Sequence, residues 1–155
     1  PWYLKNIDVE WPSLRVEAMT LLQREAELQE IVRLVGPDAL SESQRVILEA
    51  ARMIREDYLM QSAFHPIDTY CDVRKAFLML KIIIEFYRRM NQAVERGVPL
   101  SKILELPLRE DIARMKIQPN ETFEEVAKQI LQKIDEEFKR LEAEAQELVE
   151  TVTPT

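Results

Sequence analysis

Apolar side chains recur at spacings of three, four and seven along most of this 155-residue chain, as in helices that bury one face. The first such stripe begins after Pro12-Ser13, a typical helix start, and stops before Gly36-Pro37, a typical helix end. Its members are Leu14, Ala18, Leu21, Leu28, Val32 and Val35. We therefore predict a first helix between these signals, preceded by a lead-in segment over residues 1–12.

A second helix is predicted to start at Ser41, because Ser41 and Gln44 have the spacing of a capping box. The segment 61–66 contains the single histidine and ends in proline, which indicates a loop. The apolar stripe of this second helix comprises Val46, Ile47, Ala50, Ala51, Ile54, Tyr58 and Leu59.

A third helix is predicted over residues 72–96, ending at Gly97. The run 77–84 is apolar on most sides, so this helix is expected to be the most buried one. Pro99 and Pro107 punctuate residues 98–118, where a short helical turn is predicted from Ser101.

The last predicted helix is long, running from a candidate capping box at Thr122 and Glu125 to about Val149. The chain contains no strand pattern and no internal repeat. The predicted fold class is therefore all-α: a bundle of four main helices, with a short-helix connection and a long C-terminal helix. The stripe of that last helix is Val126, Ile130, Ile134, Phe138, Leu141, Ala145 and Leu148.

Composition excludes several classes of function. The formal net charge is −7, and residues 120–155 carry 10 acidic and 4 basic side chains, so there is no basic footprint for nucleic acid. The most apolar stretch, residues 76–87, is far shorter than the roughly 20 residues of a membrane-spanning helix. A single cysteine and a single histidine exclude an internal disulfide and multi-histidine metal sites. Two isolated glycines, Gly36 and Gly97, exclude a phosphate-binding loop.

No catalytic machinery is visible among the acidic pairs, His65 or Cys71. Neighbouring acids on a helix point in different directions, so solvated or capping roles are expected for them. The acidic pairs are Glu56-Asp57, Asp68 with Asp72, and Glu110-Asp111. No metal site is expected either.

Two apolar residues in loops leave alternatives open. Phe64 either pins its loop onto the core or offers a flat wall against which a planar ligand stacks. Leu40 either folds inward as a hydrophobic staple ahead of the Ser41 cap or projects outward as a contact point.

Several ordered blocks resemble one family, the C-terminal helical domain of the catalytic A subunit of archaeal A-type and vacuolar V-type ATPases. The resemblance implies that residues 1–155 form a single C-terminal domain of a larger polypeptide, and the absence of a leading Met agrees with an excised piece. It also implies that the nucleotide-binding domain lies outside this chain. The blocks are residues 5–8, Trp11, 28–42, 51–57, 63–65, 68–71 and 96–100.

The resemblance further implies a role in coupling ATP synthesis or hydrolysis to rotation of a central stalk and to ion transport. It assigns adenine contacts to Ala63 and Phe64, and no catalytic residue to this chain. ATP or ADP with Mg²⁺ would bind the full-length protein, which would sit beside the B subunit of the catalytic ring and the coiled-coil stalk, peripherally on the cytoplasmic side of the cell membrane. The stalk-facing residues would be Pro37, Asp38, Ala39, Leu40, Ser41 and Glu42. The alternative is a stand-alone adaptor whose acidic last helix binds a coiled-coil partner.

Overall fold

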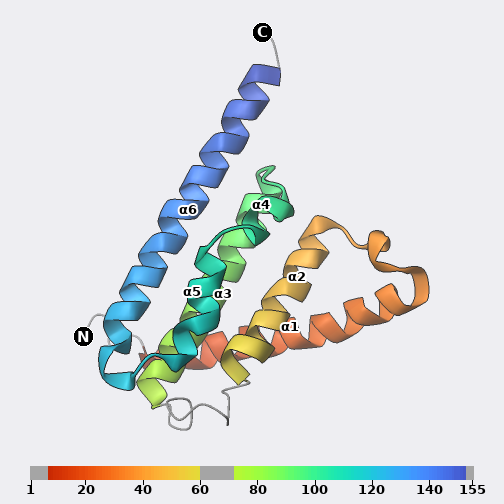
Figure 1. Cartoon of the computed structure of the whole chain (residues 1–155). Coiled ribbons are helices and arrows are strands. Elements are labelled where there is room, and N and C mark those ends of the chain that lie inside the picture. Colours follow the sequence, from red (N-terminus) through yellow and green to blue (C-terminus); the bar gives the residue numbers. More distant parts are fainter. Residues whose placement is uncertain (1–6, 60–71, 153–155) are drawn as a thin grey trace.

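The computed structural model describes residues 7–59 and 72–152, and these two ranges form helices joined by short connections, with no strand (Figure 1). The predicted all-α class is therefore confirmed for the described residues. The elements are α1 (Ile7–Val35), the 3-10 turn η2 (Pro37–Ala39), α2 (Glu42–Met53), the π-helix η3 (Ile54–Leu59), α3 (Val73–Glu95), α4 (Leu100–Leu104), α5 (Leu108–Arg114), the 3-10 turns η4 (Met115–Ile117) and η5 (Asn120–Thr122), and α6 (Phe123–Val152).

Helix α3 is the centre of the bundle, as its apolar run predicts, and it packs against α1, α2 and α6. Phe77 of α3 meets Trp11 of α1 edge-to-face at a centroid distance of 5.7 Å. Phe86 of α3 meets Phe138 of α6 in the same way at 5.4 Å. These contacts join the first and last helices to the same central element, so the described residues share one hydrophobic core.

The start predicted for α1 is wrong, because α1 already begins at Ile7 and contains Pro12. A proline has no backbone N–H, so the hydrogen bond from position 12 to the carbonyl of Asp8 is missing. Little more than one turn precedes Pro12, and this position therefore costs one bond rather than a break in the helix. Residues 7–12 therefore form the first turns of α1.

The connection between α3 and α6 contains Pro99 and Pro107, which directly precede α4 and α5 respectively. The predicted turn at Ser101 lies within α4, and α5 is an additional short helix. Thr122 belongs to the 3-10 turn before α6, and its hydroxyl donates to the carbonyl of Pro119 at 3.4 Å. The proposed Thr122 cap is therefore replaced by a turn that leads directly into α6.

A buried lysine fixes this connection to the core. Lys75 is 2% exposed, and its ammonium group donates to the carbonyls of Lys116 and Gln118 at 2.6 and 2.7 Å. The same nitrogen lies 5.6 Å from the ring centre of Phe123. A buried charge is tolerated only when its hydrogen bonds are satisfied, and here backbone carbonyls in and just after η4 accept them.

Among the described helices, none is long and apolar enough to cross a bilayer.

Candidate functional site

The connection between α1 and α2 projects from the bundle at the far end of α1 (Figure 1). Gly36 ends α1 with a φ of 92°, a left-handed conformation that glycine adopts without strain. Its amide donates to the carbonyl of Val32 at 2.8 Å, and the amide of Leu40 donates to the carbonyl of Pro37 at 3.2 Å. The chain thus turns sharply through a hydrogen-bonded 3-10 turn rather than through an open loop.

The turn is braced from within by Leu40, which is 7% exposed. The structure therefore selects the inward, staple-like alternative for Leu40 and excludes an outward contact through its side chain in this conformation. The predicted capping box is confirmed: the amide of Gln44 donates to Ser41 Oγ at 3.2 Å, and the amide of Ser41 donates to Gln44 Oε1 at 2.9 Å. Burial of Leu40 and the cap together hold the tip in one conformation.

Arg45 ties the turn to α2 from the outside. Its guanidinium donates to the carbonyl of Pro37 at 3.4 Å and lies 3.8 Å from the carboxylate of Asp38. Asp38 itself is fully exposed, so this pair contributes little to stability. Pro37, Ala39 and Glu42 are exposed as well. The surface of the tip is therefore available to a partner, while its backbone is fixed.

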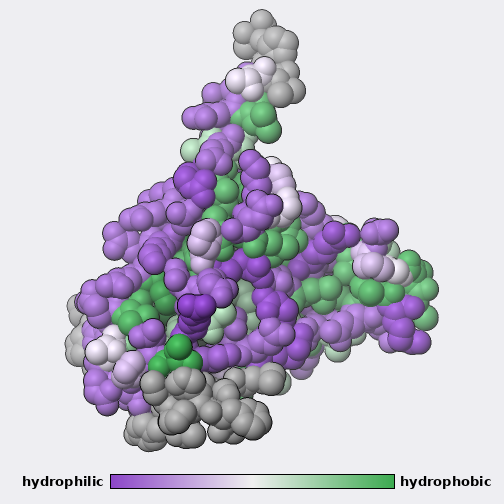
Figure 2. Space-filling model, viewed as in Figure 1, coloured by the Kyte–Doolittle hydropathy of each residue, from purple (hydrophilic) through white to green (hydrophobic). Residues whose placement is uncertain are grey.

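The last turn of α1 adds an apolar surface that the sequence pattern did not reveal. Val35 was expected to be buried as the last member of its stripe, and this is wrong: Leu34 and Val35 are each 67% exposed. Ile31, one turn earlier, is 38% exposed. We call Ile31, Leu34, Val35 and residues 37–39 the α1 tip. Figure 2 shows apolar surface on this projecting end of the molecule.

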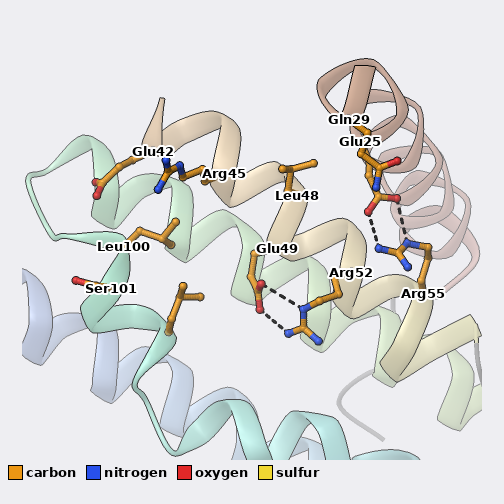
Figure 3. Close-up of a pocket in the computed structure, with 11 residues that line it drawn as sticks. Glu25, Gln29, Glu42, Arg45, Leu48, Glu49, Arg52, Arg55, Leu100 and Ser101 are labelled. Carbon is orange, nitrogen blue, oxygen red and sulfur yellow. Dashed lines mark hydrogen bonds and ion pairs between the residues drawn. The ribbon is translucent and has the colours of Figure 1, made fainter. Parts of the chain in front are cut away.

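Behind the α1 tip, a cleft of about 470 Å³ separates α1, α2 and α4 (Figure 3). Two ion pairs lie among the side chains that line it, and one of them joins two elements. Arg55 donates two hydrogen bonds to the carboxylate of Glu25 at 2.7 and 3.0 Å, which joins η3 to α1. Further residues that line the cleft are Gln29, Glu42, Arg45, Leu48, Glu49, Arg52, Leu100, Ser101 and Leu104.

Glu49 accepts hydrogen bonds from two arginines, one on its own helix and one on another helix. Arg52 of α2 and Arg109 of α5 both donate to its carboxylate. Burial by itself would raise the pKa of Glu49, but the hydrogen bond from Arg52 and the charge of Arg109 outweigh it and hold the pKa below the ordinary value. Hydrogen bonding to Glu49 raises the pKa of Arg52 despite partial burial. The pair with Arg109 joins α2 to α5, whereas the pair with Arg52 lies within α2.

Asp57 is buried in a different environment, at 6% exposure on the π-helix η3. It lines a small cavity of about 150 Å³ beside Arg109 and Ala113. Burial raises its pKa above the ordinary value, and the nearby charge of Lys116 offsets this only in part. Asp57 is therefore a carboxylate whose ionisation opposes folding.

Replacing Asp57 with asparagine is expected to increase the free energy of unfolding at pH 7 by roughly 1 kcal/mol. A pKa raised in the folded protein means that the penalty is present when the group is ionised. The gain should therefore shrink as the pH falls through that raised pKa towards the ordinary pKa of aspartate, about 3.9, and vanish only well below it, where Asp57 is protonated in both states. Urea unfolding of the wild type and Asp57→Asn between pH 4 and 8 measures this. The exposed Glu110→Gln is the matched control, and a gain that does not depend on pH would contradict the assignment.

Of the remaining candidate residues, some have structural roles and the others lie outside the described ranges. Asp72 caps α3, its carboxylate accepting from the amide of Lys75 at 2.8 Å. Glu110 and Asp111 face solvent and pair with Arg114 and Lys133 at 3.6 and 3.1 Å. In the ranges that the structure describes, no group of three or more His, Cys, Asp or Glu side chains could hold a metal ion. Ala63, Phe64, His65, Asp68 and Cys71 lie outside the described residues.

The fold and this site define a class: an all-helical domain that presents a braced, partly apolar tip, backed by ion pairs that clamp its helices together. The chain belongs to the family described as the C-terminal domain of V and A type ATP synthase, which matches residues 1–104.

Curated relatives support this membership over nearly the whole chain. The A subunit of the A-type ATP synthase of Methanopyrus kandleri is 56% identical over 144 residues, covering 93% of this chain and 24% of the relative. The corresponding proteins of Thermococcus sibiricus and Staphylothermus marinus are each 51% identical, covering 90% and 96% of this chain and 23% and 25% of the relatives. The chain thus spans about a quarter of the length of the relatives that it matches.

Proposed function

We propose that this chain is the rotor-facing C-terminal domain of the catalytic subunit of a rotary A/V-type ATPase. In that role it couples ATP synthesis or hydrolysis to rotation of a central stalk and so to ion transport. The observation that carries the proposal is the α1 tip, where a rigid backbone supports exposed apolar side chains. A part that transmits force needs such a projection, because a flexible loop would bend instead of pushing.

Within the proposed contact, the residues have different tasks. Pro37, Asp38 and Ala39 contact the stalk directly, together with the exposed Leu34 and Val35. Leu40 and Ser41 support the turn without contacting the stalk: Leu40 is buried beneath it, and Ser41 caps α2. Glu42 lies exposed at the first position of α2, at the edge of the same surface. The surface is mainly apolar, so shape and packing carry the contact more than charge.

The clamps behind the α1 tip connect this surface to the rest of the domain. Glu49 joins α2 to α5 through Arg109, and Glu25 joins α1 to η3 through Arg55. A displacement of the bundle by closure of the nucleotide site would therefore move the tip with it. Such coupling requires different stalk contacts in the open and closed states of the nucleotide site.

In the full-length protein, Ala63 and Phe64 are proposed to form part of the adenine pocket. ATP or ADP with Mg²⁺ would be held by the nucleotide-binding domain, and this chain alone is expected to show no ATP turnover. The full-length protein would be paired with the B subunit of the ring around the central stalk, peripherally on the cytoplasmic side of the membrane.

Replacing Phe64 with alanine in the full-length protein is expected to weaken nucleotide binding about fivefold, because aromatic stacking contributes on the order of 1 kcal/mol. Equilibrium titration with a fluorescent ATP analogue measures this, and Phe64→Tyr serves as the control that keeps the ring. Equal affinity of wild type and Phe64→Ala would remove the adenine assignment while leaving the proposed stalk contact intact.

A further inference from the structure

The π-helix η3 is joined to three other elements within its six residues. Arg55 of η3 donates two hydrogen bonds to the carboxylate of Glu25 on α1. The ammonium group of Lys116 on η4 donates to the backbone carbonyl of Glu56 at 3.0 Å, and Asp57 lines the small cavity that η3 shares with α5. π-Helical turns are rare in proteins and are often found at functional sites. A change in the conformation of η3 therefore reaches α1, α5 and η4 together.

Among the described residues, no cation forms an ion pair with the buried carboxylate of Asp57, which is 6% exposed. Three cations lie on the elements around it, but their hydrogen bonds go to the carboxylates of Glu49 and Glu56 and to backbone carbonyls. These cations are Arg52, Arg109 and Lys116. The charge of Asp57 is therefore buried without direct compensation, which is a costly arrangement.

Charged groups lie on every element that packs against η3, and none of them removes this cost. Burial is the largest effect on Asp57 and raises its pKa, while the charges of Lys116 and Arg52 offset the rise only in part. An ionised Asp57 is consequently more stable when η3 opens and water reaches the carboxylate. The charged groups are Arg52, Glu49 and Glu56 on α2 and η3, Arg109 and Glu110 on α5, Lys116 on η4, and Lys75 on α3.

The elements that cover Asp57 are short, so they separate from η3 more easily than the long helices separate from one another. Helix α5 has seven residues and η4 has three. The cavity between η3 and α5 is large enough to admit water, and Nε of Arg109, which lines it, is buried with no hydrogen-bond partner among the described residues. Short elements beside a cavity open at a lower free energy than the core of a domain. Opening at this place therefore hydrates Asp57 without unfolding α3 or α6.

We propose that η3 is a proton-sensitive latch. When Asp57 carries a proton, η3 stays closed against α5 and η4 and holds α1 through the pair of Arg55 and Glu25. When Asp57 is ionised, η3 opens more often, and each opening releases that pair. The rigidity of the outer half of α1 thus depends on one proton. The latch is a property of the domain itself, and it does not depend on the stalk contact.

Hydrogen exchange of the full-length protein, followed by mass spectrometry, tests the latch. Wild type and Asp57→Asn are compared at pH 7.5 and at pH 4.5, because a difference between variants at one pH cancels the titration of all other groups. The neutral Asp57→Asn should lower the opening of residues 54–59 about fivefold at pH 7.5, and by no more than about threefold at pH 4.5. Residues 26–35 of α1 should follow residues 54–59. The exposed Glu110→Gln is the matched control and should exchange like the wild type at both pH values.

Four results would overturn the latch. The first is equal exchange of residues 54–59 in wild type and Asp57→Asn at pH 7.5. The second is a difference of the same size at both pH values, which would be an effect of the substitution and not of the proton. The third is a change that spreads equally to α3 and α6, since this would be global unfolding. The fourth is a response of residues 54–59 that leaves residues 26–35 unchanged, because Arg55 and Glu25 would then not transmit it.

Discussion

Replacing Phe138 with alanine is expected to lower the free energy of unfolding by about 3–5 kcal/mol. Phe138 is fully buried on α6, and its ring meets Phe86 of α3 edge-to-face. The guanidinium carbon of Arg89 lies 5.6 Å from the centre of the same ring, and Arg89 pairs with Asp135 at 2.8 Å. Truncation removes the aromatic pair and leaves a cavity at the seam between the central and the last helix.

Urea unfolding of the chain measures this loss as a shift of the midpoint. Phe138→Leu, which fills more of the space, should cost only roughly 1–2 kcal/mol. Leu148→Ala is the matched control from the same seam beyond the end of α3, and it should change stability by less than about 0.5 kcal/mol. Equal losses for Phe138→Ala and Leu148→Ala would mean that α6 does not pack against α3 as described.

Much of this fold follows from short-range patterns that the sequence makes explicit. The Ser41–Gln44 capping box forms as predicted because its two hydrogen bonds depend only on residues three apart. Gly36 and Gly97 both adopt positive φ, of 92° and 94°, at the helix ends where they were expected. The central position of α3 follows from its apolar run, since a helix that is apolar on most sides must be covered on most sides.

The predictions are wrong where the burial of a side chain depends on whether another helix or turn covers it. Val35 continues the stripe of α1 but is exposed, because a stripe predicts burial only where a partner helix runs alongside. Lys75 is buried because a distant turn supplies carbonyl acceptors, and no local pattern announces this. The π-helix η3, which places Asp57 in the interior, likewise has no signature in the spacing of apolar residues.

The same distinction applies to the candidate site. Position and rigidity of the α1–α2 turn were predictable from Gly36, Pro37 and the Ser41 cap. Whether Leu40 is buried beneath the turn or points outward was not predictable, because an apolar side chain suits both burial and contact with a partner. The structure buries Leu40 and exposes Leu34 and Val35 instead. A run of apolar residues that reaches the last turn of a helix before a projecting loop is the signal that would have identified them.

Replacing both Leu34 and Val35 with aspartate in the full-length protein is expected to impair coupling severely. Each side chain is 67% exposed, so the changes should leave the fold of the domain intact. In contact with a stalk, however, they would place two charges in an apolar interface, where desolvation is costly. Losing the apolar contacts alone amounts to roughly 2 kcal/mol per copy of the domain, which corresponds to about 30-fold weaker binding of the stalk. Val16→Asp with Met19→Asp, a similarly apolar and exposed pair nearer the start of α1, is the matched control.

Single-molecule measurement of the torque on the stalk during ATP hydrolysis by the assembled complex tests the proposed function most directly. With Leu34→Asp and Val35→Asp, we expect the torque to fall at least twofold while ATP hydrolysis continues. The Val16 and Met19 control should retain the torque of the wild type. Wild-type torque in the Leu34 and Val35 variant, or an equal loss in the control, would contradict a contact between the α1 tip and the stalk.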